Sequence, residues 1–256
     1  MTFETDTPLA HAVCPAHNRE PRRGDAKPSL LVLHYTGMSS AAKAIDWLAR
    51  PESGVSCHYV VDEHGHITQL VPEELRAWHA GASYWRGETD INSHSIGIEI
   101  QNPGHQHGYP DFPLKQMRAV VALSQDIVRR HRISPDSVLA HSDVAPGRKI
   151  DPGEKFNWLH LAKEGVGLWV RPLPVRADDP GFGPGTQGSA VLSAQKNLAV
   201  FGYDVEASGT LDADTEKVLK AFQLHFRPRR VDGRLDRSTE VTLEKVVEAS
   251  RRRAAA

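Results

Sequence analysis

Residues 29–35 read SLLVLHY, and residues 95–101 read SIGIEIQ. Both runs have the length and the Leu, Ile and Val content of buried strands. In the second run three isoleucines alternate with a glycine, Glu99 and a glutamine, so the isoleucines face one side of a sheet and Glu99 faces the other. The first run ends in His34 and Tyr35. We therefore predict polar side chains at the ends of two buried strands.

Helical and hairpin patterns surround these two runs. Amphipathic spacing predicts helices at 39–50 and 114–131, and a tight turn predicts a hairpin of strands at 58–62 and 67–71. Strands that alternate with helices predict an α/β fold with a mixed central β-sheet flanked by helices. Residues 1–28 are polar and rich in proline, and we expect them to form an N-terminal extension over the surface.

The amino-acid composition changes after residue 172. Residues 173–187 are rich in Pro and Gly and predict a linker, while 188–250 predict a small three-helix bundle with helices at 189–201, 212–226 and 236–250, before a tail at 251–256. The sequences GTLDADTE and GRLDRSTE begin the last two helices. In each, the aspartate (Asp212 and Asp236) is a candidate N-cap, so the repeat is a way of starting a helix and carries no chemistry itself.

Composition excludes several classes of protein. The 256 residues carry 31 Lys and Arg against 32 Asp and Glu, which gives no basic surplus for nucleic acid or an anionic membrane. Two cysteines exclude a disulfide-rich module. The sequence has no apolar run long enough for a transmembrane segment and no signal peptide at its start, so we expect a cytoplasmic protein. A periplasmic protein that has lost its signal remains the alternative.

Histidine is the unusual residue. Of 14 histidines, only His225 lies after residue 170. Two that follow apolar segments, His34 and His141, together with Asp151 form a set typical of a catalytic zinc site, in which three protein ligands leave a fourth position for water. Spacing alone leaves the alternative open that each is a surface or satisfied core residue.

Longer runs carry a resemblance to a known family. They are VLHYTG at 32–37, SCHYVVDEHGHITQLVPE at 56–73, AWHAGASYW at 77–85, SIGIEIQN at 95–102 and AHSDVAPGRKIDPG at 140–153. These runs resemble the zinc-dependent N-acetylmuramoyl-L-alanine amidases, a family shared with phage amidases and peptidoglycan recognition proteins. The resemblance implies a catalytic domain at 29–172. Residues 188–250 are similar to a helical peptidoglycan-binding domain, and the combination looks most like the AmiD-type amidases.

The resemblance implies both an activity and its residues. It makes His34, His141 and Asp151 the ligands of one Zn²⁺ per chain, and Glu99 and Lys149 the catalytic pair. The implied reaction is hydrolysis of the amide bond between N-acetylmuramic acid and L-alanine in peptidoglycan or muropeptides, in cell-wall turnover or recycling. We expect a monomer with no nucleic-acid partner.

A few further residues are candidates for contact with the substrate. Tyr35, next to a ligand, and His79 and Trp85, in the AWHAGASYW run, are candidates. Two other functions stay open: a recognition protein that binds peptidoglycan without cleaving it, and a zinc peptidase acting on the stem peptide. We expect deletion of the C-terminal domain to weaken wall binding while small muropeptides are still cleaved.

Overall fold

The computed structural model of the protein describes residues 3–254. A six-stranded sheet has the strand order β1-β5-β4-β7-β3-β8, and β2 pairs with β6 in a separate two-stranded sheet. The strands are β1 (Ala12–Val13), β2 (Arg19–Pro21), β3 (Leu30–Tyr35), β4 (Tyr59–Val61), β5 (Ile67–Gln69), β6 (Leu75–Ala77), β7 (Ser95–Ile100) and β8 (Val138–Ala140).

Strand β3 lies at the centre of the parallel part of the sheet. It pairs in parallel with β7 on one side and with β8 on the other, and β4 continues the sheet in parallel with β7. β4 and β5 form the predicted antiparallel hairpin. The sheet is therefore mixed and the α/β prediction is confirmed. The carboxyl ends of parallel strands meet at one edge, which is where such folds place their sites.

Helices cover both faces of the sheet. They are α1 (Ala41–Ala49), α2 (Ile91–His94), α3 (Leu114–His131), α4 (His141–Val144), α5 (Trp158–Lys163), α6 (Ser189–Phe201), α7 (Ala213–Phe226) and α8 (Arg237–Ala254), with short 3₁₀ turns at Arg23–Asp25, Pro51–Ser53, His105–His107 and Pro135–Ser137. The helix starts follow the sequence, because Ser40 caps α1 and Asp212 caps α7 through their side chains. Helix α3 has the predicted bounds.

The face of the sheet towards α3 is the closed, apolar one. Ile96, Ile98 and Ile100 of β7 are fully buried there, in one cluster with Leu31 and Leu33 of β3 and with Val120, Leu123 and Ile127 of α3. The alternation predicted for β7 is thus correct. It leaves every second residue of β3 and β7 for the opposite face, and these include His34 and Glu99.

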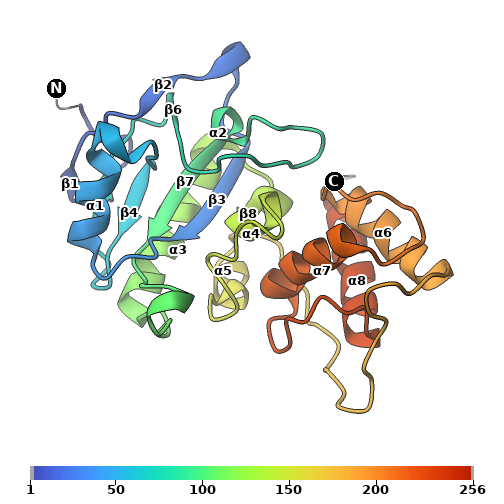
Figure 1. Ribbon diagram of the computed structural model, residues 1–256. Coiled ribbons are helices and arrows are strands. Elements are labelled where there is room, and N and C mark those ends of the chain that lie inside the picture. The colour runs from blue at the N-terminus through green and yellow to red at the C-terminus, as the bar shows by residue number, and fades with distance from the viewer. Residues whose placement is uncertain (1–2, 255–256) are drawn as a thin grey trace.

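The opposite face is shared by α1 and the C-terminal helices. Ala44 and Leu48 of α1 pack on Val60 of β4. At the other side of the sheet, Leu30 and Val32 of β3 belong to one buried cluster with apolar residues of α6, α7 and α8. Figure 1 shows α4 and α5 between the sheet and these three helices. The part of the chain that contains α6, α7 and α8 is called the helical part below. It shares a core with the sheet and does not stand apart from it.

Two segments differ from the expectation. Residues 1–28 contribute β1 to the edge of the main sheet and β2 to the small one, so this segment is more than a surface wrap. Helix α8 continues through residues 251–254, which were expected to form a tail. Arg, Arg, Arg and Ala are good helix formers and nothing in the sequence ends the helix at residue 250.

Candidate metal centre and active-site cavity

Three neighbouring strand ends position the polar side chains of the site. His34 is the second-last residue of β3, and its partner in the parallel register is Glu99 of β7, so both side chains leave the same face side by side. His141 follows β8 directly as the first residue of α4. Asp151 lies in the loop after α4. The backbone N–H of Ser142 donates to the Asp151 carbonyl at 3.0 Å, and this hydrogen bond holds the loop against α4.

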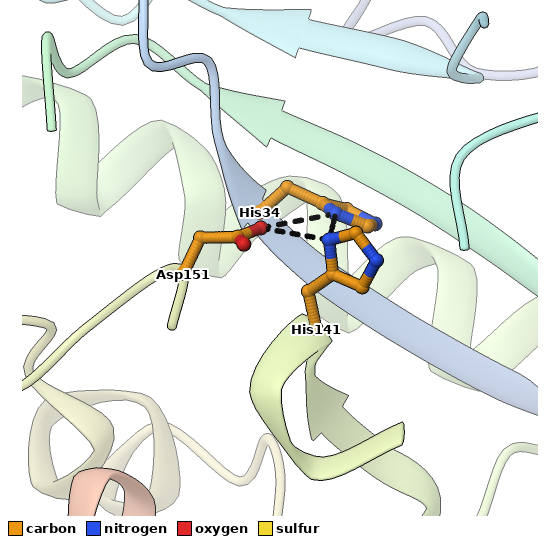
Figure 2. A group of neighbouring side chains, drawn as sticks. All are labelled: His34, His141 and Asp151. Carbon is orange, nitrogen blue, oxygen red and sulfur yellow. Dashed lines mark hydrogen bonds and ion pairs between the residues drawn. The ribbon is translucent and has the colours of Figure 1, made fainter. Parts of the chain in front are cut away.

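The three predicted ligands converge. Nδ1 of His34 lies 2.8 Å from Nδ1 of His141, and Oδ2 of Asp151 lies 3.3 and 3.0 Å from these two nitrogens. Figure 2 shows the side chains pointing toward one another from β3, α4 and the loop. All three are buried, and their donor atoms lie within 4.8 Å of one another, close enough to hold one metal ion.

The outer nitrogens fix which ring atoms carry the protons. Nε2 of His141 lies 3.1 Å from the carbonyl oxygen of Ala80, which only accepts a hydrogen bond. In the neutral ring the single proton is therefore on Nε2, and Nδ1 is a bare lone pair. The arrangement is the usual one for a metal-ligating histidine, whose second nitrogen donates to a carbonyl or carboxylate.

His34 reaches the same state through a longer chain. The Ser95 hydroxyl donates to the carbonyl of Ile91 at 2.6 Å, so its oxygen accepts from Nε2 of His79 at 3.0 Å. Nδ1 of His79 is then an acceptor, and it accepts from Nε2 of His34 at 2.9 Å. Burial and the nearby His141 lower the pKa of His34 to about 4, so its ring is neutral at pH 7. Its Nδ1, like that of His141, is bare.

This donor set fits a metal ion. Two bare imidazole nitrogens and a carboxylate oxygen face one another at 2.8–3.3 Å, an arrangement that is repulsive unless a cation lies between them. Two nitrogens and one oxygen are a donor set typical of a catalytic zinc site.

A cavity of about 590 Å³ opens over this centre. Glu99 and Lys149 line it together with His141 and Asp151. Burial and the charge of Asp151 raise the pKa of Glu99 well above its usual range, while Lys149 lowers it. Oε2 of Glu99 has no hydrogen-bond partner within residues 3–254. The structure thus brings a strongly basic carboxylate and a cation into the cavity that His141 and Asp151 line.

The candidate substrate contacts have different outcomes. Tyr35 lines the cavity, and its hydroxyl lies 3.1 Å from Nδ1 of His105. The prediction for Trp85 is corrected: its ring is 1% exposed and packs edge-on against Phe201 and Tyr203 of the helical part. Trp85 is therefore an anchor between the two parts of the chain and has no surface left for a sugar.

His79 has a role that sequence reasoning missed. It borders the cavity, but both of its nitrogens are engaged by His34 and Ser95, so it supports a ligand. The sequence contains one indication that His79 is close to β7, because Gly97 interrupts the isoleucines of that strand. A Cβ at position 97 would lie 2.5 Å from the His79 ring. Glycine inside a strand often marks such a close approach.

Two known families match parts of this chain. Residues 24–154 match the N-acetylmuramoyl-L-alanine amidase family, and residues 187–243 match a family of peptidoglycan-binding domains. Within residues 3–254 no helix is both long and apolar enough to cross a membrane.

Individual relatives agree along most of the chain. The N-acetylmuramoyl-L-alanine amidase AmiD of Escherichia coli is 39% identical over 234 residues, which are 86% of this chain and 82% of the relative. The structure of that protein in complex with the substrate anhydro-N-acetylmuramic acid-L-Ala-D-γ-Glu-L-Lys superposes with a TM-score of 0.75 at 36% identity, covering 90% of this chain and 92% of the other. AmpDh3 from Pseudomonas aeruginosa superposes with a TM-score of 0.73 at 30% identity, covering 97% and 98%.

Proposed function

The chain belongs to the N-acetylmuramoyl-L-alanine amidase family, and on this premise we propose that it hydrolyses the amide bond between N-acetylmuramic acid and L-alanine with one zinc ion per chain. The single observation that carries the proposal is the convergence of His34 Nδ1, His141 Nδ1 and Asp151 Oδ2 beneath a cavity that also holds Glu99. All three ligands come from one chain, which supports a site that is complete in a monomer.

Zinc is the metal that the donor set favours. The nitrogens of His34 and His141 and an oxygen of Asp151 would hold it and leave a position free for substrate or water. Bound there, Zn²⁺ supplies the Lewis acidity that brings the pKa of a water molecule to about 7 and polarises a carbonyl oxygen.

Glu99 is placed to move the proton. Its raised pKa makes it a strong base once ionised, and its unpartnered Oε2 is free to accept the proton that the attacking water loses. The same carboxyl group then returns the proton to the departing nitrogen of L-alanine. Amide hydrolysis needs this second transfer, because an amide nitrogen leaves as a neutral amine and not as an anion.

Lys149 is placed to stabilise charge. Its ammonium group lines the cavity and acts on the pKa of both Glu99 and His34, which places its charge close to the centre. Negative charge that develops on the carbonyl oxygen during attack is stabilised by such a group, and loss of one such donor costs about 3–4 kcal/mol.

The substrate we propose is a muropeptide or the peptidoglycan from which it comes. The relative AmiD was solved with an anhydro-N-acetylmuramic acid tripeptide as its substrate, and its structure matches this chain across both parts. The match of residues 187–243 to peptidoglycan-binding domains supports a cell-wall ligand.

Mass spectrometry of digested muropeptides tests the proposal. The zinc-loaded protein should release free stem peptides that begin with L-alanine, and Glu99→Gln should release none above background. Intact muramyl-L-alanine with shortened stems would show a peptidase. Undigested muropeptide that nevertheless binds would show a recognition protein. Either of these two results would reject the amidase.

A further inference from the structure

A second cluster of histidine and carboxylate lies on the other side of α4. Nδ1 of His225, on α7, lies 2.6 Å from Oδ2 of Asp143, and the hydroxyl of Tyr203 donates to Oδ1 of Asp143 at 2.6 Å. Asp143 is 0% exposed, and His225 and Tyr203 are each 2% exposed. The cluster therefore joins α4 to the helical part of the chain in a dry environment, where hydrogen bonds to a charged group are strong.

Asp143 also determines the start of α4. Its Oδ2 accepts the backbone N–H of Ala140 at 2.8 Å, and Ala140 is the residue immediately before the ligand His141. Helix α4 is only four residues long, so its own backbone hydrogen bonds do little to hold it. The orientation of His141 thus depends on where the Asp143 carboxylate is held, and two of the three donors that hold it come from the helical part.

The two donors are themselves rigid. The His225 ring stacks between Trp158 of α5, at 3.7 Å, and Phe226, at 4.0 Å. Tyr203 packs edge-on against Trp85 at 5.0 Å. Burial together with the charge of Asp143 raises the pKa of Tyr203 well above its usual value, so it remains a hydrogen-bond donor.

Asp151 is tied to the same turn. The backbone N–H of Ser142, which lies between His141 and Asp143, donates to the Asp151 carbonyl at 3.0 Å. A shift of α4 therefore moves two of the three ligands together. Metal centres are sensitive to such shifts. Residues that orient the ligands typically contribute about 10–100-fold to metal affinity or activity.

We propose that Tyr203 and His225 of the helical part are positioning residues for the metal ligand His141, and act through Asp143. The helical part then completes the metal centre, in addition to any contact it makes with the cell wall. The inference rests on the proposed metal site and goes beyond it, because it assigns a role in metal binding to residues of the helical part.

The test measures metal affinity in the full-length chain. Tyr203→Phe and His225→Leu should each bind Zn²⁺ about 10–100-fold more weakly in competition with a chromogenic chelator. With Co²⁺ in place of Zn²⁺, their visible absorption bands should shift, because the ligand geometry changes. In activity assays kcat should fall more than KM rises. His225→Asn, whose side-chain amide places an N–H near the position of Nδ1, should recover most of the affinity.

Arg86→Gln is the matched control for loosening of the contact between the two parts. Arg86 reaches across this contact and donates to the Phe201 carbonyl at 3.0 Å. It also donates to Asp136 of its own part at 2.7 Å, and it does not contact Asp143. This variant should keep wild-type zinc affinity and the wild-type cobalt spectrum. The proposal is overturned if Tyr203→Phe and His225→Leu bind zinc like the wild type, or if Arg86→Gln weakens binding equally.

Failure of this inference is distinguishable from failure of the proposed function. If the wild type releases stem peptides while both variants keep full zinc affinity, only the positioning role is rejected. If the wild type releases no stem peptides, the amidase is rejected, and the zinc affinities still decide whether Tyr203 and His225 support His141.

Discussion

Two clusters of histidine and carboxylate flank the short helix α4, and they have opposite chemistry. In one, His34, His141 and Asp151 converge beneath an open cavity. In the other, His225 and Asp143 meet in the buried contact between the sheet and the helical part. The residue types, the burial and the distances are similar.

The difference lies in where the protons are. Each oxygen of Asp143 accepts a hydrogen bond from a neighbour, so this carboxylate is satisfied by protein donors. Around Asp151, by contrast, the two histidines have committed their Nε2 protons elsewhere and present bare Nδ1 atoms. The lone pairs of the metal centre thus converge without a proton between them, whereas the carboxylate lone pairs of Asp143 are matched with donors.

The largest effect is expected from His141→Ala. Structural zinc is bound with about 10–16 kcal/mol over four ligands, so one ligand contributes roughly 3–4 kcal/mol, or on the order of 10²–10³-fold in affinity. The variant should lose zinc on dialysis, as measured by atomic absorption, and with it nearly all activity. His225→Leu in excess zinc should still bind one ion. Equal loss of zinc in both variants would contradict the claim that only the first cluster binds the metal.

Glu99→Gln should separate catalysis from metal binding. Glu99 is not among the converging ligands, so zinc stoichiometry should stay at the wild-type value. A glutamine cannot accept the proton, and kcat should fall by about 10²–10⁴-fold. Loss of zinc in this variant would mean that Glu99 belongs to the metal centre.

His79 should affect zinc affinity more weakly than a ligand does. His79→Leu removes the acceptor for His34 Nε2 and should weaken zinc binding by about 10–100-fold. His79→Gln keeps an acceptor in reach and should lose less. His64→Leu, in an exposed turn, is the control and should bind zinc like the wild type. Equal affinity in His79→Leu and His64→Leu would contradict the relay through Ser95.

The smallest effect concerns the pH profile. Glu99 works as a base only when ionised, so activity falls as the pH drops through its raised pKa. Lys149 lowers that pKa, so Lys149→Met should raise it and move the acid limb of kcat/KM to higher pH. Lys163→Met, exposed on α5, should leave the limb in place. An acid limb that stays or moves to lower pH would show that Lys149 does not act on Glu99.

Much of the site is predictable from sequence because its residues sit at strand ends within long runs. The alternation in residues 95–101 places Glu99 opposite the isoleucines, and the structure agrees. No periodic pattern indicates the direction of a loop side chain. The sequence therefore suggests Trp85 as a substrate contact, although it packs against Phe201 and Tyr203.

Long-range partners are the other part that sequence does not reveal. Asp143 and His225 lie 82 residues apart, and no spacing rule connects them. The repeat at Asp212 and Asp236 indicates how the helices start but not which face they turn to the sheet. No sequence pattern therefore predicts the shared core around Leu30 and Val32, and the sequence alone predicts a separable helical part.

Zinc titration of the metal-free protein tests the central claim most directly. Chelator-treated protein, supplied with increasing Zn²⁺, is assayed for release of L-alanine-terminated stem peptides from a muropeptide. Activity should rise from near zero in proportion to zinc and reach its plateau at one ion per chain. Activity that persists without metal, or a plateau at another stoichiometry, would contradict a single zinc centre at His34, His141 and Asp151.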